Sequence, residues 1–133
     1  MGRFVKIKGR LVANGKQQDR DLYPNSSSPT AALSSLFMVL AIAANKKQKA
    51  AVIDIGGAYL NAEMTGEEVL MELDPLLSKL ALQTDPSIKP FIDERGVTVV
   101  KLDKALYGCV QSARLWYDKL VNVLSGKIGR AHV

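Results

Sequence analysis

The chain has 133 residues, 47% of them apolar, and its 18 basic and 13 acidic side chains give a net charge of +5. This length suits one domain or a part of a larger one, and the apolar content excludes a disordered chain. The longest apolar run, residues 31–44, would span about 21 Å as a helix. That is too short to cross a bilayer, so we expect a soluble protein with no membrane partner.

One cysteine and one histidine restrict the chemistry. Cys109 has no partner for an internal disulfide, which predicts a small buried thiol and a reducing compartment. Because the single histidine, His132, lies near the end of the chain, most zinc sites and any histidine-based triad in the core are excluded. The N-terminus lacks the apolar segment of a signal peptide, and we expect an intracellular location.

The first third of the chain predicts a basic strand and an apolar helix. In residues 3–13, basic side chains alternate with apolar ones, which predicts a strand or hairpin with one positively charged face. The polar, turn-rich residues 14–28 predict a loop. Ser28 and Pro29 suit the N-cap and first position of a helix over 30–44, and its apolar faces predict that it is buried.

The remainder predicts further strands separated by helices. Three strands are expected at 50–55, 67–73 and 97–102. A short helix is expected at 75–83 and a loop at 84–96. We expect an α+β fold, in which helices cover one face of an antiparallel or mixed sheet.

An amphipathic helix is predicted at 111–124. Arg114 and Asp118 lie on its polar side, one turn apart, where they can form an ion pair. The residues expected to face inward are Ala113, Trp116, Leu120, Val123 and Leu124.

The stretch AVIDIGGAYLNAEM, residues 51–64, places the carboxylate of Asp54 in an apolar strand. A buried carboxylate is costly unless it is paired, hydrogen-bonded or bound to a metal. One interpretation is that Asp54 caps the Gly56-Gly57 turn. The other is that the bare glycine backbone holds a metal-bound triphosphate and Tyr59 lies against its sugar. The stretch alone leaves both interpretations open.

Four blocks together resemble the reverse transcriptase domain of copia-type LTR retrotransposons. They are KGRLVANG at 8–15, SSPT followed by LFMVLAIAA, DIGGAYLNAEMTGEEVLMELD at 54–74, and KLDKALYGCVQSARLWYDKL at 101–120. The family's order and spacing are kept. Gly57, Val110 and Ser112-Ala113 depart from its usual residues, which are Thr or another polar residue, Lys and Ala-Pro.

The resemblance implies a role for individual residues. Asp54 would be the first catalytic carboxylate and a Mg²⁺ ligand in two-metal nucleotidyl transfer, and the Ile55 backbone carbonyl would be a second ligand. Tyr59 would exclude a 2′-hydroxyl, and Gln111 would lie close to the template strand. The residues expected to bind the incoming nucleotide are Lys8, Arg10, Gly57, Ala58, Tyr59, Tyr107 and Gly108.

The resemblance also implies that the chain is a fragment. Residues 1–127 would form the fingers and first half of the palm, without the family's later block of two adjacent aspartates. With one metal ligand of three, the fragment alone is expected to be inactive. Residues 128–133, IGRAHV, match one reading frame of a widely used sequencing adapter, so we expect a non-native tail.

The expected partners of the intact domain are an RNA template, a DNA primer and deoxynucleoside triphosphates, within a cytoplasmic particle of the parent element. The alternative is a degenerate, non-catalytic RNA-binding or interaction module that uses the basic N-terminal strand. An aromatic-x-Asp-Asp hairpin encoded downstream would favour the polymerase.

Overall fold

The computed structural model describes residues 9–128. Its helices are α1 (Leu33–Asn45), α2 (Pro75–Thr84) and α3 (Ser112–Ile128), and its strands are β1 (Leu70–Leu73) and β2 (Thr98–Lys101). Short 3-10 turns occur at Gly15–Gln17, Arg20–Leu22, Ala58–Asn61 and Pro86–Phe91. The predicted α+β class is confirmed. No helix within 9–128 is both long and apolar enough to span a membrane. Lys8 and tail residues 129–133 lie outside the described range.

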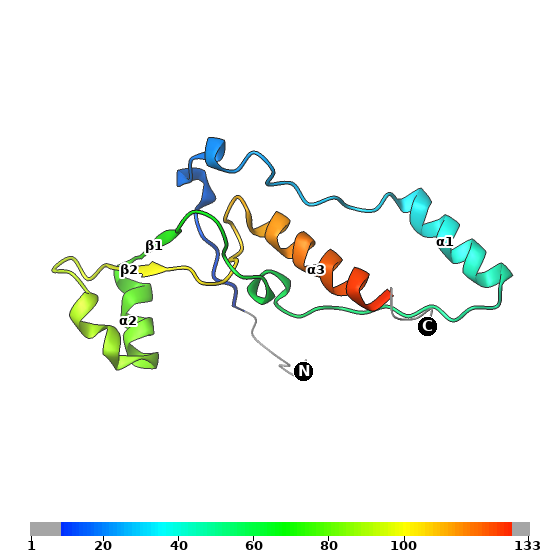
Figure 1. Ribbon diagram of the computed structural model, residues 1–133. Coiled ribbons are helices and arrows are strands. Elements are labelled where there is room, and N and C mark those ends of the chain that lie inside the picture. Colours follow the sequence, from blue (N-terminus) through cyan, green and yellow to red (C-terminus); the bar gives the residue numbers. More distant parts are fainter. Residues whose placement is uncertain (1–8, 129–133) are drawn as a thin grey trace, which may run out of the picture.

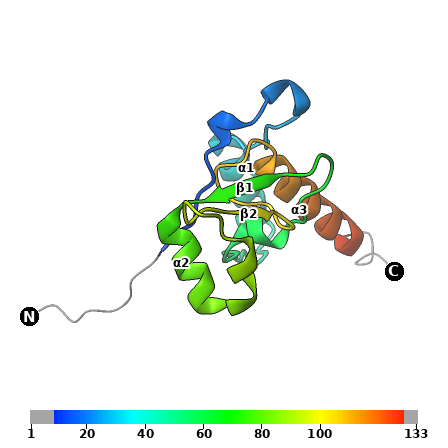
Figure 2. The same cartoon turned by 90° about the vertical axis from the view of Figure 1, so that its left-hand side faces the viewer.

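A two-stranded antiparallel sheet and α2 form one end of the molecule (Figures 1 and 2). Leu70 pairs with Lys101 and Leu73 with Thr98, which confirms strands within 67–73 and 97–102. The Asp74 carboxylate accepts a 2.8 Å hydrogen bond from the Leu77 N–H and caps α2, as the helix prediction requires. The buried Ser78 hydroxyl donates to the Leu73 carbonyl at 3.0 Å and ties α2 to β1.

The core lies where the segment after Ala58–Asn61 meets the segment that leads into α3. Its buried apolar residues are Ala62, Val69, Leu73, Ala105, Leu106 and Cys109. A backbone hydrogen bond joins the two segments: the Ala105 N–H donates to the Ala62 carbonyl at 2.9 Å. The buried Ser112 hydroxyl, at the start of α3, donates to the Leu106 carbonyl at 2.7 Å. This core positions the candidate site.

Helix α3 bears out part of its predicted pattern. Arg114 and Asp118 form the expected ion pair at 2.8 Å. Trp116 is half-buried. Val123 and Leu124 are 47% and 48% exposed, so their predicted inward orientation is wrong. Side chains exposed to this degree face no covering element within residues 9–128.

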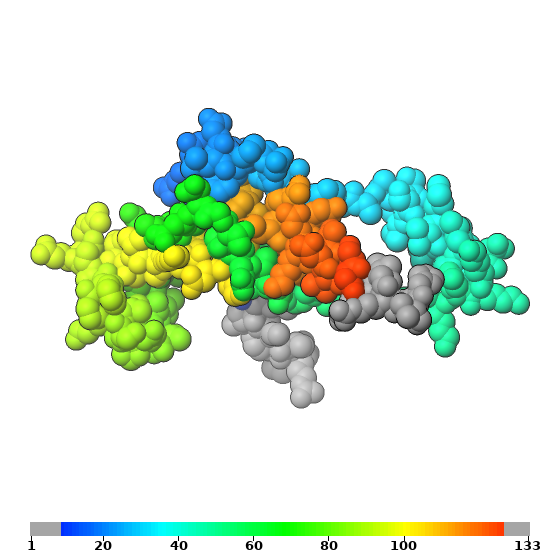
Figure 3. Space-filling view, in the orientation of Figure 1, coloured from blue at the N-terminus to red at the C-terminus, as the bar shows by residue number. Residues whose placement is uncertain are grey.

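Helix α1 differs from its prediction at its start and in its burial. It begins at Leu33 after Ala32, which makes no side-chain cap, so the predicted start at Ser28-Pro29 is wrong. None of its residues is buried, and Phe37 is 60% exposed. Burial of an apolar surface is favourable, but it requires another surface to cover it. Extended segments join α1 to the rest of the molecule, and it stands apart at one side (Figures 1 and 3).

Two predicted strands are absent from the described residues. The strand predicted at 50–55 is wrong, because these residues form no strand pairing, and Val52 and Ile53 are 100% and 83% exposed. Residues 9–13 likewise form no strand, although the Ala13 N–H donates to the Tyr107 carbonyl at 2.7 Å. A strand needs a neighbouring chain to accept and donate its backbone hydrogen bonds, and residues 9–128 provide no such partner here.

Candidate nucleotide-binding site

The Gly56-Gly57 turn is held by Asn61. Gly57 has a φ of +61° and precedes the 3-10 turn Ala58–Asn61. The Asn61 Nδ2 donates to the carbonyl oxygens of Gly56 and Gly57 at 3.3 and 3.1 Å. Sequence reasoning missed this role, because an asparagine four residues after a glycine pair is only a weak signal of a turn.

Asp54 lies just before this turn and is exposed. Within residues 9–128 its carboxylate makes no hydrogen bond or ion pair that would occupy its oxygens. The alternative in which Asp54 caps the turn is therefore not the arrangement found, since Asn61 makes both turn contacts. The Asp54 carboxylate remains open to a ligand.

Three of the predicted nucleotide-binding residues form one stack. The rings of Tyr59 and Tyr107 lie 4.6 Å apart between centroids, inclined by 33°. The Arg10 guanidinium carbon lies 4.6 Å from the centroid of the Tyr107 ring. Both distances are typical of stabilising aromatic and cation–π contacts. The fold therefore brings together side chains from the KGRLVANG, DIGGAYLNAEM and KALYG segments.

A hollow of about 270 Å³ lies beside this stack. Its lining residues are Gly9, Arg10, Leu11, Gly57, Leu60, Leu106 and Tyr107. Its wall therefore combines the Gly57 backbone, which carries no side chain, with the Arg10 cation and the Tyr107 ring. These are groups that suit phosphate, sugar and base.

Gly108 allows two backbones to pass at close range. Its φ is +95°, and a methyl group there would overlap the Ala13 carbonyl oxygen. A methyl group on Gly15 would likewise overlap the Gly108 carbonyl oxygen. The glycines of the first and last blocks thus hold Arg10 and Tyr107 in reach of each other.

Gln111 is a buried member of a polar network, 6% exposed. The Gln18 Nε2 donates to its Oε1 at 3.1 Å, and its own Nε2 lies 3.2 Å from the Met64 sulfur. The Gln18 Oε1 accepts a 2.8 Å hydrogen bond from the Val110 N–H. Gln18, which no sequence signal singled out, therefore anchors the segment after Gly15–Gln17 to the start of α3.

A metal site is not assembled from the described residues. Within 9–128 no three His, Cys, Asp or Glu side chains lie close enough to hold an ion together. Asp54 has the hard oxygen atoms that Mg²⁺ prefers, but it stands alone. One carboxylate does not fit a two-metal centre by itself.

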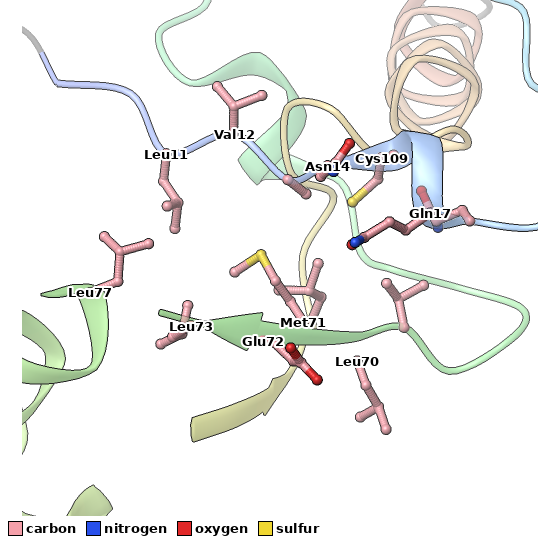
Figure 4. A pocket seen from close by; sticks show the side chains of 15 residues that line it. Leu11, Val12, Asn14, Gln17, Leu70, Met71, Glu72, Leu73, Leu77 and Cys109 are labelled. Carbon is pink, nitrogen blue, oxygen red and sulfur yellow. The ribbon is translucent and has the colours of Figure 1, made fainter. Parts of the chain in front are cut away.

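A larger pocket of about 530 Å³ lies between the segment that begins at Leu11 and strand β1 (Figure 4). Leu77 lies at one end and Cys109 at the other. Burial raises the pKa of the Cys109 thiol, and its hydrogen bond with Ser112 opposes this in part. The predicted small buried thiol is confirmed.

Cys109 is expected to react with iodoacetamide at least about tenfold more slowly in the native chain than in urea, because thiolate is scarce and the sulfur is covered. It is the single cysteine, so mass spectrometry of the whole chain measures its rate directly. Equal rates in both states would contradict the buried placement.

Comparison with known proteins places these residues in a family. The family model described as reverse transcriptase (RNA-dependent DNA polymerase) matches residues 2–129. The chain is 34% identical, over 92% of its length, to the retrovirus-related Pol polyprotein from transposon RE1 of Arabidopsis thaliana. It is 28% identical, over 88% of its length, to that from transposon TNT 1-94 of Nicotiana tabacum.

It is also 28% identical, over 95% of its length, to the transposon Ty1-H Gag-Pol polyprotein of Saccharomyces cerevisiae. The chain spans only 8% of the RE1 and TNT 1-94 polyproteins and 6% of the Ty1-H polyprotein. No solved structure matches it. By its family model and these relatives, the chain belongs to the reverse transcriptases of copia-type retrotransposon Pol polyproteins.

Proposed function

We propose that residues 1–127 are the fingers and first half of the palm of a reverse transcriptase domain. The complete domain extends a DNA primer on an RNA template with deoxynucleoside triphosphates. The observation that carries the proposal is the stack of Arg10, Tyr107 and Tyr59 beside the Gly57 hollow. Three blocks distant in the sequence converge there, on side chains suited to a nucleotide.

Each predicted site residue is given a role in binding the nucleotide or the template. The Arg10 guanidinium offers its N–H groups to the triphosphate. Gly57 and Ala58 begin a 3-10 turn, where the first N–H groups lack intrahelical acceptors and are available to phosphate oxygens. Tyr59 lies under the sugar, and Tyr107 and Gly108 line the same pocket, with the Tyr107 ring packed against that of Tyr59. We also propose Lys8 as a ligand of the triphosphate or the template backbone, and Gln111, held by Gln18, as a residue near the template strand.

Asp54 and the Ile55 carbonyl are proposed as ligands of Mg²⁺ in the complete domain. Bound Mg²⁺ there would stabilise negative charge on the reacting phosphate oxygens. Because residues 9–128 place a single carboxylate at this point, the present chain alone is expected to add no nucleotide.

Primer extension tests the function. A complete domain that contains these residues should lengthen a labelled DNA primer on RNA in the presence of Mg²⁺, and excess chelator should stop it. The 133-residue chain should not lengthen it under the same conditions. A complete domain that retains the primer–template but never extends it would overturn the polymerase and favour the binding-only alternative.

One observation favours that alternative. The exposed Lys16 and Arg20 line a polar hollow of about 420 Å³, and within 9–128 neither forms an ion pair. Such cations suit a nucleic-acid backbone without catalysis. The extension assay distinguishes the two functions.

Tyr59→Val is expected to raise the ratio of ribonucleotide to deoxynucleotide incorporation by about tenfold, the equivalent of about 1.4 kcal/mol of lost discrimination. The reason is that valine lacks the Tyr59 ring, which would otherwise clash with the 2′-hydroxyl of a ribonucleotide. Single-nucleotide extension with each substrate measures the ratio. Tyr59→Phe keeps the ring and should leave the ratio within about twofold. An unchanged ratio in Tyr59→Val would remove this residue from the sugar pocket.

A further inference from the structure

Tyr107 is the central member of the stack. Its ring contacts the Arg10 guanidinium, whose carbon is 4.6 Å from the ring centroid. It also contacts the Tyr59 ring, at 4.6 Å between centroids. Within this stack, Arg10 and Tyr59 are thus linked through Tyr107.

Tyr107 is also held in place by the core. It follows Ala105 and Leu106, which are 0% and 7% exposed. Its carbonyl accepts the 2.7 Å hydrogen bond from the Ala13 N–H. Arg10, in contrast, is exposed on an irregular segment. Tyr107 therefore provides a surface, anchored by the core, against which the exposed Arg10 side chain is oriented.

A ring orients an arginine without using its donors. Within residues 9–128 Arg10 forms no ion pair. A carboxylate partner would neutralise the charge and occupy N–H groups, whereas stacking uses only the flat face of the guanidinium. The edge N–H groups and the full charge of Arg10 remain available to an anion.

We propose that Tyr107 is a positioning residue that sets Arg10 and Tyr59 together, so that triphosphate binding and sugar selection depend on one ring. The inference rests on the proposed function of this site. Its distinctive consequence is that a single change at Tyr107 impairs both properties, although each is carried by another side chain.

The first test examines the stack in this chain, without catalysis. NMR of Tyr107→Leu should show the Arg10 side-chain protons losing their upfield ring-current shift and the Tyr59 ring signals moving. Tyr107→Phe should preserve both sets of signals. Tyr117→Leu is the matched control, because Tyr117 also lies beneath an arginine, with the Arg114 carbon 5.9 Å from its centroid, but on α3. Unchanged Arg10 and Tyr59 signals in Tyr107→Leu would overturn the inference.

The second test uses the complete domain. Tyr107→Leu should raise the KM for deoxynucleotide about tenfold and also increase ribonucleotide incorporation about threefold to tenfold. Tyr107→Phe and Tyr117→Leu should stay within about twofold of the unmodified domain. A change in only one property, or an equal loss in Tyr107→Phe, would overturn the coupling. If the unmodified domain fails to extend primers, the proposed function fails, and the NMR result still decides whether Tyr107 positions its neighbours.

Discussion

Asp54→Asn is expected to reduce Mg²⁺-dependent nucleotide addition by a complete reverse transcriptase domain about a thousandfold or more. Asparagine keeps the size of the side chain but removes the negative charge that attracts the cation. Metal ions contribute several kcal/mol of charge stabilisation in such reactions, and each 1.36 kcal/mol is about tenfold in rate. Primer extension under single-turnover conditions measures the loss.

The fold should survive this substitution. Asp54 is exposed and its carboxylate makes no hydrogen bond or ion pair within 9–128, so the free energy of unfolding should change by less than about 0.5 kcal/mol. Asp21→Asn is a matched control, since Asp21 is also exposed and lies on the separate 3-10 turn Arg20–Leu22. Its extension rate should be unchanged. Full extension by Asp54→Asn would remove Asp54 from the catalytic centre.

Gly108→Ala is expected to lower the free energy of unfolding by about 3 kcal/mol or more. A φ of +95° is strained for alanine, at a cost of about 1–3 kcal/mol. In addition the new methyl group would overlap the Ala13 carbonyl oxygen, and such overpacking costs roughly 1–3 kcal/mol. Urea unfolding followed by the fluorescence of Trp116, the single tryptophan, measures the change.

Gly66→Ala separates the two causes. Gly66 has a similar φ of +89°, but a methyl group there meets nothing within 4 Å. The free energy of unfolding of Gly66→Ala should therefore fall by only about 1 kcal/mol, which is the cost of the backbone strain alone. Equal losses at Gly66 and Gly108 would show that the close passage of the Ala13 backbone contributes nothing.

Elements formed from neighbours in the sequence were predictable. The start of α2 follows from Asp74 and Pro75, and the ion pair of Arg114 with Asp118 follows from their spacing. The two paired strands follow from their apolar and β-branched residues. In each case the signals lie within a few residues of the structure that they specify, so no distant partner is needed.

Helix α1 and the predicted strand at 50–55 show what local sequence patterns do not predict. Their apolar residues predict that both segments are buried, yet Phe37 and Val52 are 60% and 100% exposed. Sequence periodicity identifies the face that prefers to leave water, but it does not supply the surface that covers it. The predicted burial and the predicted strand fail for the same physical reason.

The amino-acid sequence alone was sufficient to predict the α+β class, the family blocks and the residue types of the site. It did not predict that Arg10, Tyr107 and Tyr59 form one stack, or that Gly108 passes against the Ala13 backbone, because both depend on the folded arrangement of the chain. These contacts join residues nearly fifty to a hundred positions apart, and no local pattern encodes their distances. They depend on how the buried segments cross, which is a property of packing rather than of neighbouring residues.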